Sequence, residues 1–268
     1  LRDYTDQYIT AFREDADALG LEPVEETPRA TDEDNLRSMV EMIQALDANG
    51  HTYRSDGSVY FKISTLPDYG KLARLDHDGI QSGARVDADK YEKDDARDFV
   101  LWKATTKDEP TWDFGVGPGR PGWHIECSAM ALRLLDGAPI DIHAGGVDLV
   151  FPHHENEIAQ SECATGHKFV HTWMHAGAIR VNKEKMSKSL GNFFTIREIL
   201  EKYPAEVVRY FLVSSHYRSQ VDYSEDNLAE AGRTLTKLYH ALRGITPAKE
   251  ADVPESDHDR RFAEAMDD

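Results

Sequence analysis

The sequence has little cysteine and no long apolar run, and both shortages limit what the chain can be. Only Cys127 and Cys163 occur among 268 residues, which is too few for a disulfide scaffold and is typical of a reducing compartment, where thiols serve metal or redox chemistry. No apolar stretch approaches the roughly 20 residues that a membrane helix needs. We therefore expect a cytoplasmic protein that does not enter a membrane.

The sequence also lacks an initiator methionine and a signal-peptide pattern. It opens Leu1-Arg2-Asp3-Tyr4, without the basic and apolar segments of a secretory leader. Its length and its hydrophobic content of 40% are sufficient for a folded core. We expect the chain to be a fragment of a longer protein or the product of a partial gene.

Basic residues are scarce relative to acidic ones. There are 31 Lys and Arg against 49 Asp and Glu, which gives a formal charge of −18. Because nucleic-acid affinity rests on neutralising phosphates, this charge is unusual for an RNA-binding protein. It favours a protein from a very salty cytoplasm, where ions screen the repulsion and an acidic surface maintains solubility. The alternative is an ordinary acidic enzyme with one local basic patch.

The first hundred residues are expected to contain two helices followed by a β-rich stretch. Residues 4–19 and 34–48 carry apolar side chains three and four positions apart, which predicts amphipathic helices. Asp56-Gly57 lies between two short β-type runs and predicts a hairpin. A further strand is expected over 98–104, after the polar and irregular stretch 64–97.

From Pro121 onward the pattern alternates between strands and helices. The expected order is strand 123–125, helix 128–135, strand 140–143, helix 152–164 and strand 169–179. This alternation favours a parallel sheet with crossover helices. Ligands of such sheets bind at the carboxyl ends of the strands, where Cys127, His143 and Asp148 are expected.

The last third of the chain is expected to be helical. Thr195 and Glu198 have the spacing of a capping box, and Pro204 is expected to open a helix that runs to Val213. A bundle helix is expected over 228–242. Residues 246–268 are weakly patterned, and we expect them to begin a linker or a truncated domain.

His153 and Glu157 are candidate metal ligands. They lie four residues apart on an expected helix, so their side chains share one face and can bind one zinc ion. The alternative is a helix N-terminus that simply favours acidic residues. Cys127, from a separate segment, would complete a Cys/His/Glu set. Cys163 lies six residues beyond Glu157, off that face, and is expected to be a small buried hydrophobe.

Residues 185–189 read Lys-Met-Ser-Lys-Ser, and Leu190-Gly191-Asn192 follow. Two lysines beside small hydroxyl residues suit a loop that closes over a polyphosphate, because lysine supplies charge and serine supplies donors. A solvated basic loop is the alternative.

Three motifs together resemble those of a known family. The Lys185–Ser189 pentapeptide is the signature of class I aminoacyl-tRNA synthetases, and Gly122–Ser128 (GWHIECS) and Phe151–Glu157 (FPHHENE) resemble cysteinyl-tRNA synthetases. The resemblance extends over almost the whole chain. Two features of that family are absent from this sequence: the His-Ile-Gly-His motif and the zinc-binding cysteine that precedes it.

The resemblance implies an α/β fold. We expect the second half of a class I synthetase Rossmann-type catalytic domain, with a small β-rich insertion and a C-terminal helical region. The expected divisions are a helical part of the catalytic domain at 1–36, a connective insertion at 37–117, the second half of the nucleotide-binding domain at 118–170, a stem-contact region with the signature loop at 171–228, and the start of a helical bundle or linker at 229–268.

The resemblance also implies a zinc ion, one per chain, held by Cys127, His153 and Glu157 together with the absent cysteine. In the family the substrate cysteine binds zinc through its own thiolate, which discriminates against serine. Lys188 would contact ATP, which is used with Mg²⁺, and Lys185 would support it.

Three further residues are candidates for substrate binding. Trp123 would line the amino-acid pocket, His143 would lie near the substrate side chain, and Asp148 would receive the ammonium group. Core packing is the alternative for Trp123, and a turn after Gly145-Gly146 is the alternative for Asp148.

The expected function is ATP-dependent activation of cysteine and its transfer to tRNA(Cys) by a monomeric enzyme. This chain alone is expected to be inactive, since only one phosphate motif is present. One alternative is a mycothiol-type cysteine:amino-sugar ligase, against which the stretches His153–Gln160 and Tyr217–Ser219 count. The other is a non-catalytic RNA-binding remnant. Five basic residues are candidates for contact with the tRNA acceptor stem or for a solvated helix face: Arg209, Arg218, Arg233, Lys237 and Arg243.

Overall fold

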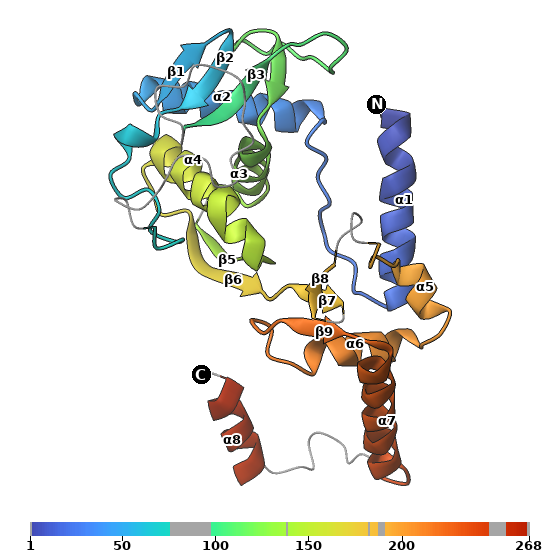
Figure 1. Ribbon diagram of the computed structural model, residues 1–268. Coiled ribbons are helices and arrows are strands. Elements are labelled where there is room, and N and C mark those ends of the chain that lie inside the picture. Colours follow the sequence, from blue (N-terminus) through green and yellow to red (C-terminus); the bar gives the residue numbers. More distant parts are fainter. Residues whose placement is uncertain are drawn as a thin grey trace.

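A computed structural model of the protein (Figure 1) shows a larger body of strands and helices, followed by a smaller, mainly helical body. The structure describes residues 2–75, 98–137, 139–181, 183–186, 191–246 and 256–266. The mixture of parallel strands, crossover helix and helical C-terminal region confirms the expected α/β class. None of the helices in these ranges is long and apolar enough to cross a bilayer.

An antiparallel sheet forms the β-rich part of the larger body. Its strands, in spatial order, are β1 (Thr52–Ser55), β2 (Ser58–Phe61), β3 (Phe99–Ala104) and β4 (Gly119–Pro121). The predicted hairpin is confirmed: β1 and β2 pair around Asp56 and Gly57, which both have positive φ, at 47° and 78°. Two such residues are what a tight hairpin turn of the sheet's own twist requires.

Three helices pack beside this sheet and form the core: α2 (Glu33–Ala48), α3 (Trp123–Leu134) and α4 (Glu155–Thr165). The apolar stripe of α2 is buried as its spacing predicts, with Leu36, Met39, Ile43 and Leu46 almost inaccessible to solvent. Each such side chain contributes about 1.5–3 kcal/mol when it is fully buried. The expected division at residue 36 therefore falls inside a core helix.

A short parallel sheet carries the candidate site. Strands β5 (Ile140–Gly146) and β6 (Val170–Ala176) pair in register from Ile140 opposite Val170 to Gly146 opposite Ala176. Helix α4 lies in the connection between them, as a parallel pair requires. Both strands therefore present their carboxyl ends at one edge.

The structure corrects one expected strand. Residues 123–125 form the first turn of α3 instead of a strand. The backbone N–H of Gly122 donates to Leu101 and so closes the antiparallel sheet. Ile125 and Ala129 then face the core from one side of a helix. Cys127 consequently lies within α3, and not at a strand–helix junction.

The next expected helix, 152–164, is present with a modified start. A single helical turn, Val150–His154, contains the extended residue Phe151 and leads directly into α4. The turn gives His153 and His154 buried positions just before the α4 segment that holds Glu157. A histidine pair is thereby directed into the interior.

The second body contains a small sheet and a group of helices. Its elements are β7 (Ile179–Val181), β8 (Glu184–Lys185), α5 (Ile196–Leu200), α6 (Ala205–Val213), β9 (Val221–Tyr223), α7 (Glu225–Leu242) and α8 (Asp257–Met266). The capping box of Thr195 and Glu198 at the start of α5 is confirmed. Helix α8 lies in the stretch that was expected to begin a linker or a truncated domain.

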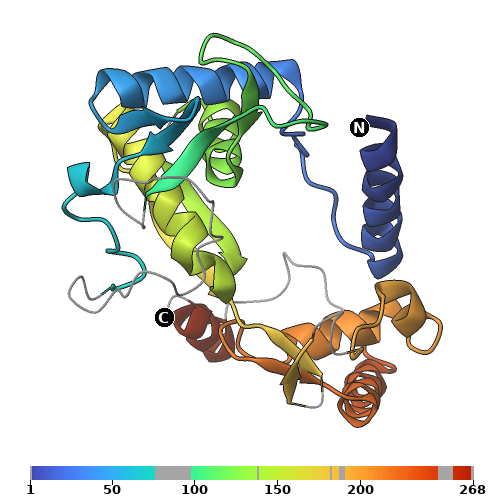
Figure 2. The ribbon, with the colours of Figure 1, turned by 45° about the horizontal axis from the view of Figure 1, so that its top comes forward.

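Helix α1 (Arg2–Leu19) stands apart from α2 and packs beside α5 and α6 (Figures 1 and 2). Arg197 binds Glu14 at 2.9 Å and Asp15 at 2.6 Å. Arg209 donates to the carbonyl of Leu19, one of the orphan carbonyls at the end of α1. Arg209, one of the five candidate RNA contacts, therefore serves as a cap between helices.

Candidate metal and substrate site

Cys127, His153 and Glu157 meet in the interior of the larger body. Their potential ligand atoms all lie within 4.8 Å of one another. Glu157 is inaccessible to solvent and His153 is 4% exposed. The His153 Nε2 atom lies 3.7 Å from Glu157 Oε2, as expected for residues one helical turn apart. The structure thus brings together the three residues that the sequence proposed as ligands.

The Glu157 carboxylate has one satisfied oxygen and one orphaned oxygen. Oε1 lies 3.1 Å from His143 Nε2, whereas Oε2 is buried without a hydrogen-bond partner among the described residues. Leaving a carboxylate oxygen dry and unpaired is costly. A cation beside Oε2 would remove this cost, so the residues present fit a metal ion.

The electrostatics of Cys127 also fit a metal site. Burial, together with the charges of Glu157 and Glu126, raises the pKa of the Cys127 thiol to about 12. Burial also raises the pKa of Glu126 to about 7. The thiol therefore keeps its proton unless a cation stabilises the thiolate. A sulfur, nitrogen and oxygen donor set is one that zinc accepts.

A second set of possible ligands shares Glu157. The potential ligand atoms of His143, His154 and Glu157 also lie within 4.8 Å of one another. Burial, followed by the neighbouring imidazoles, lowers the pKa of His154 to about 3. Burial alone would lower the pKa of His143, but its hydrogen bond to Glu157 and the carboxylate charge outweigh burial and raise it. His154 was missed by the sequence analysis, although it adjoins His153.

Aromatic rings enclose these histidines. The ring of Trp123 stacks on His153 with centroids 4.5 Å apart, and Trp123 is 58% exposed, so it is a wall and not a core residue. Trp173 of β6 stacks on His143 at 4.7 Å. His175, two residues further along β6, lies 2.8 Å from His154, ring nitrogen to ring nitrogen. Sequence analysis missed both β6 residues.

Asp148 lies just beyond the carboxyl end of β5, in the helical turn Val147–Leu149, and is exposed. A Cβ atom at Gly146 would come within 2.5 Å of its Oδ1 atom, so the Asp148 carboxylate lies directly against the last residue of β5. Asp148 is thus at the expected edge of the sheet but belongs to neither group of possible metal ligands.

Of the two loop lysines, Lys185 and Lys188, the structure describes only the backbone of Lys185. The backbone of Lys185 belongs to β8 and pairs with Arg180, while its side chain and the whole of Lys188 lie outside the described residues. Cys163, in contrast, packs against the hydrophobic core, and burial raises the pKa of its thiol to about 11. That position agrees with the expected structural role of Cys163.

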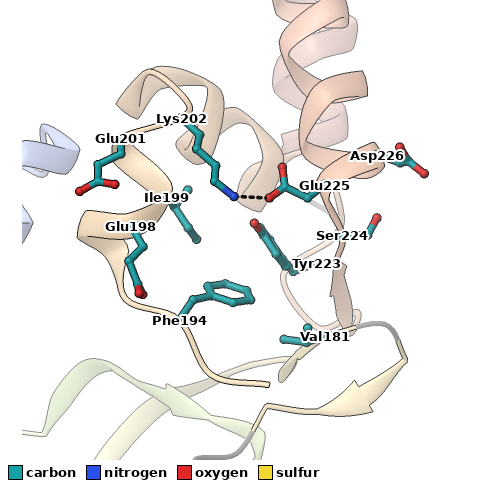
Figure 3. A pocket seen from close by; sticks show the side chains of 10 residues that line it. All are labelled: Val181, Phe194, Glu198, Ile199, Glu201, Lys202, Tyr223, Ser224, Glu225 and Asp226. Atoms are coloured by element: carbon teal, nitrogen blue, oxygen red, sulfur yellow. Dashed lines mark hydrogen bonds and ion pairs between the residues drawn. The ribbon is translucent and has the colours of Figure 1, made fainter. Parts of the chain in front are cut away.

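A cavity of about 580 Å³ lies elsewhere, in the second body between α5, β9 and α7 (Figure 3). Phe194 and Tyr223 meet at its base with ring centroids 4.3 Å apart. Two of its carboxylates are engaged, since Glu198 caps α5 and Glu225 binds Lys202 at 2.7 Å. None of the candidate metal-binding or substrate-binding residues lines the cavity, and we interpret it as a gap between packed secondary-structure elements.

Comparison with solved structures defines the class of the fold. A methionyl-tRNA synthetase from Mycobacterium tuberculosis, solved with methionyl-adenylate, covers 96% of this chain with a TM-score of 0.57 and 18% identity, and the match spans 62% of that chain. A putative arginyl-tRNA synthetase from Campylobacter jejuni matches 81% of this chain and 39% of its own, with a TM-score of 0.50 and 12% identity. The fold is that of class I aminoacyl-tRNA synthetases.

Sequence comparison narrows the class to a family. The family model described as tRNA synthetases class I (C) catalytic domain matches residues 1–233, and the chain belongs to this family. Cysteine–tRNA ligase of Marinobacter nauticus is 68% identical over 267 residues, 99% of this chain and 57% of that protein. Cysteine–tRNA ligase of Halorhodospira halophila is 55% identical over 265 residues, 98% of this chain and 56% of that protein. The chain thus spans just over half the length of these relatives.

Proposed function

We propose that this chain provides the metal and amino-acid site of a cysteine–tRNA ligase, which activates cysteine with ATP and transfers it to tRNA(Cys). The observation that carries this proposal is the Cys127/His153/Glu157 group, in which His153 and Glu157 are buried and one carboxylate oxygen is orphaned. The names of the relatives favour this activity over an amino-sugar ligase or a non-catalytic remnant. We place the enzyme in the cytoplasm and expect it to act as a monomer.

Cys127, His153 and Glu157 would hold a zinc ion. When bound, zinc would supply a soft Lewis acid that accepts the thiolate of substrate cysteine and disfavours the hydroxyl of serine. The protein would contribute the surrounding shape. Trp123 stacks on His153 and would fix the orientation of its ring. The exposed part of the indole would form an apolar wall of the pocket for the small substrate side chain.

His143 is the proposed neighbour of the substrate side chain. Its ring is held from two directions, by the hydrogen bond to Glu157 and by stacking on Trp173. A ring fixed in this way orients its substrate without an ordering cost at the moment of binding. Asp148, exposed at the carboxyl edge, would receive the substrate ammonium group.

The reaction itself follows the chemistry of adenylate formation. The cysteine carboxylate attacks the α-phosphate of ATP and releases pyrophosphate, after which a terminal ribose hydroxyl of tRNA attacks the acyl carbon and releases AMP. Lys188, supported by Lys185 and by Mg²⁺, would neutralise the departing pyrophosphate. These lysine roles rest on the sequence of residues 185–189.

Metal analysis of two cysteine variants tests the proposal. We expect the chain to bind one zinc ion when it is titrated with zinc, Cys127→Ala to lose that binding, and Cys163→Ala to keep it. The Cys163 variant is a matched control, because it removes the other thiol from the same helical layer. Metal binding that survives Cys127→Ala, or that depends on Cys163, would exclude this ligand set.

A further inference from the structure

The end of β6 is tightly joined to a segment about forty residues further along the chain. Gly177, the first residue after β6, donates its N–H to the Tyr217 carbonyl at 2.7 Å. A Cβ atom at Gly177 would lie 2.1 Å from the Ser219 carbonyl oxygen. A turn bond from Ser219 N–H to the His216 carbonyl, at 2.8 Å, closes the segment. Residues 216–219 are thereby fixed beside the carboxyl edge of the parallel sheet.

Three exposed side chains of this segment form a stack. The rings of His216 and Tyr217 are stacked with centroids 4.7 Å apart and an interplanar angle of 26°. The guanidinium of Arg218 lies over the Tyr217 ring at 5.3 Å. The backbone N–H of Arg218 also donates to His216 Nδ1 at 3.2 Å. His216 Nδ1 is therefore an acceptor, and its Nε2 remains a donor.

Arg218 differs from Arg197, Arg209 and Arg233 in its partners, and from Arg180 and Arg243, which also lack an ion pair in the described ranges, in lying over an aromatic ring. Arg197 binds two carboxylates of α1, Arg209 caps α1, and Arg233 binds Glu230 at 2.5 Å. Within the described ranges, Arg218 has no carboxylate at ion-pair distance, although the chain carries 49 acidic residues. A cation without an acidic partner in such a chain is suited to an anionic ligand.

We propose that His216, Tyr217 and Arg218 are a platform for the single-stranded 3′ end of an RNA substrate, with bases stacked on the rings and a phosphate on the guanidinium. This inference rests on the proposed function, because it assigns the RNA end to the same edge of the sheet. Unpaired bases bind proteins by stacking on aromatic and arginine planes, and the phosphate binds arginine. A free phosphate would use the cation alone and would not need the flat rings.

The position of the platform supports this assignment. Ala176, which precedes Gly177, is opposite Gly146 at the carboxyl end of β5, and ligands of parallel sheets bind at that edge. His175 and Asp148 lie on the same edge. An RNA end stacked on Tyr217 is therefore delivered to the edge of the sheet that holds the candidate substrate residues.

The experiment measures the affinity of the 268-residue chain for two RNA probes. One is a hairpin with a single-stranded 3′ tail of about four nucleotides, a length within the usual range of single-strand binding sites. The other is the same hairpin with a blunt end. We expect tighter binding of the tailed hairpin. Tyr217→Ala should weaken tailed binding by about 5- to 100-fold, the typical effect of losing one stacked base, whereas Tyr217→Phe should retain it. Blunt-hairpin binding should not change in either variant.

Two variants of Arg218 distinguish the contribution of its charge to RNA binding from the contribution of its planar stacking. Arg218→Ala should weaken tailed binding and reduce the salt dependence of the binding constant by about one ion. Arg218→Lys should keep the salt dependence but lose part of the tail preference, because an ammonium cannot stack as a planar guanidinium does. Arg260→Ala is the control, because Arg260 is an exposed arginine of α8 that pairs with Asp257 at 2.7 Å, and it should leave the tail preference intact.

Two outcomes would overturn the platform: no tail preference in the unaltered chain, or a tail preference unaffected by Tyr217→Ala and Arg218→Lys. The Arg218→Lys variant decides the question even if Tyr217→Ala unfolds the protein, since the Arg218 side chain is exposed. Failure of the platform would leave zinc binding by Cys127 unchanged, whereas failure of the proposed function would appear in that metal titration.

Discussion

The His143 ring and the Glu157 carboxylate are in direct polar contact at the candidate metal site, with Nε2 and Oε1 separated by 3.1 Å. The second oxygen of Glu157, Oε2, faces His153 and His154 at 3.7 and 3.8 Å and has no hydrogen bond within the described part of the chain. Glu157 therefore orients His143 with one oxygen and directs the other toward the position proposed for a metal ion. We therefore expect His143 to act as a positioning residue for the candidate metal site.

Replacement of His143 should weaken metal binding without removing a ligand of the Cys127 group. His143→Ala deletes the partner that fixes the Glu157 carboxylate, and loss of such outer partners typically reduces metal affinity by about 10- to 100-fold. Competition with a chromophoric zinc chelator measures the effect. His171→Ala, at an exposed position of β6, is the control and should bind zinc like the unaltered chain. Equal affinity in both variants would contradict the role of His143.

The neighbouring carboxylate, Glu155, has a structural role that can be tested separately. It is 1% exposed and accepts backbone N–H groups of Gly70 and Ala73 at 2.8 and 2.9 Å, which fixes the loop after β2 to α4. Glu155→Gln turns one acceptor into a donor that faces an N–H group. We expect a loss of about 1–3 kcal/mol, which lowers Tm by roughly 2–10 °C for a chain of this size.

The control for Glu155 is an exposed carboxylate. Glu230 pairs with Arg233 on the surface of α7, with side chains 58% and 62% exposed. Because solvent screens such pairs, Glu230→Gln should leave the stability almost unchanged. Thermal unfolding followed by circular dichroism compares the two variants. A Glu155 variant as stable as the Glu230 variant would show that the loop does not depend on this clamp.

The candidate metal ligands could be proposed from the sequence because two of the three are local. His153 and Glu157 lie one helical turn apart, and that spacing is visible in a helix of any fold. His154, Trp173 and His175 could not be recognised in the same way, because their meeting depends on how β6 lies beside α4. The only local signal for His154 is that it adjoins His153, and this neighbourhood alone does not show that both rings face inward.

The error at residues 123–125 has a related cause. Trp-His-Ile alternates like a strand, but three residues are too few to distinguish a strand from the first turn of a helix. Tertiary burial decided the outcome, since Ile125 and Ala129 share the face of α3 that meets the core. The docking of α1 on Arg197 and Arg209 was equally inaccessible to sequence reasoning, because the partners are over 180 residues apart.

Alanine substitutions at two glycines should change the stability of the fold in opposite directions. At Gly177 an added Cβ meets the Ser219 carbonyl at 2.1 Å, whereas at Gly232 in α7 the nearest atom is a Val207 methyl at 3.6 Å. Gly177→Ala should destabilise by about 1–3 kcal/mol, the usual cost of overpacking. Gly232→Ala should stabilise by about 0.5–1 kcal/mol, because alanine is the better helix former. Urea unfolding measures both, and equal effects would contradict the tight junction at Gly177.

Salt should stabilise the fold through its net charge of −18. The excess carboxylates repel one another, and the screening length falls from about 10 Å at 0.1 M to about 3 Å at 1 M salt. Surface ion pairs such as Arg197 with Glu14 will weaken over the same range, but they are exposed and contribute little each. Relief of the repulsion among the excess carboxylates should outweigh this weakening, so we expect Tm to rise continuously between these concentrations.

The choice of salt decides whether this rise reports charge. Potassium chloride is suitable, whereas sulfate stabilises most proteins by exclusion from their surface and would obscure the effect. Sucrose at matched osmolality is the control for solvent exclusion without screening. A Tm that stays flat or falls in potassium chloride would identify an ordinary acidic enzyme, because the carboxylate repulsion would then be too weak to outweigh the loss of surface ion pairs.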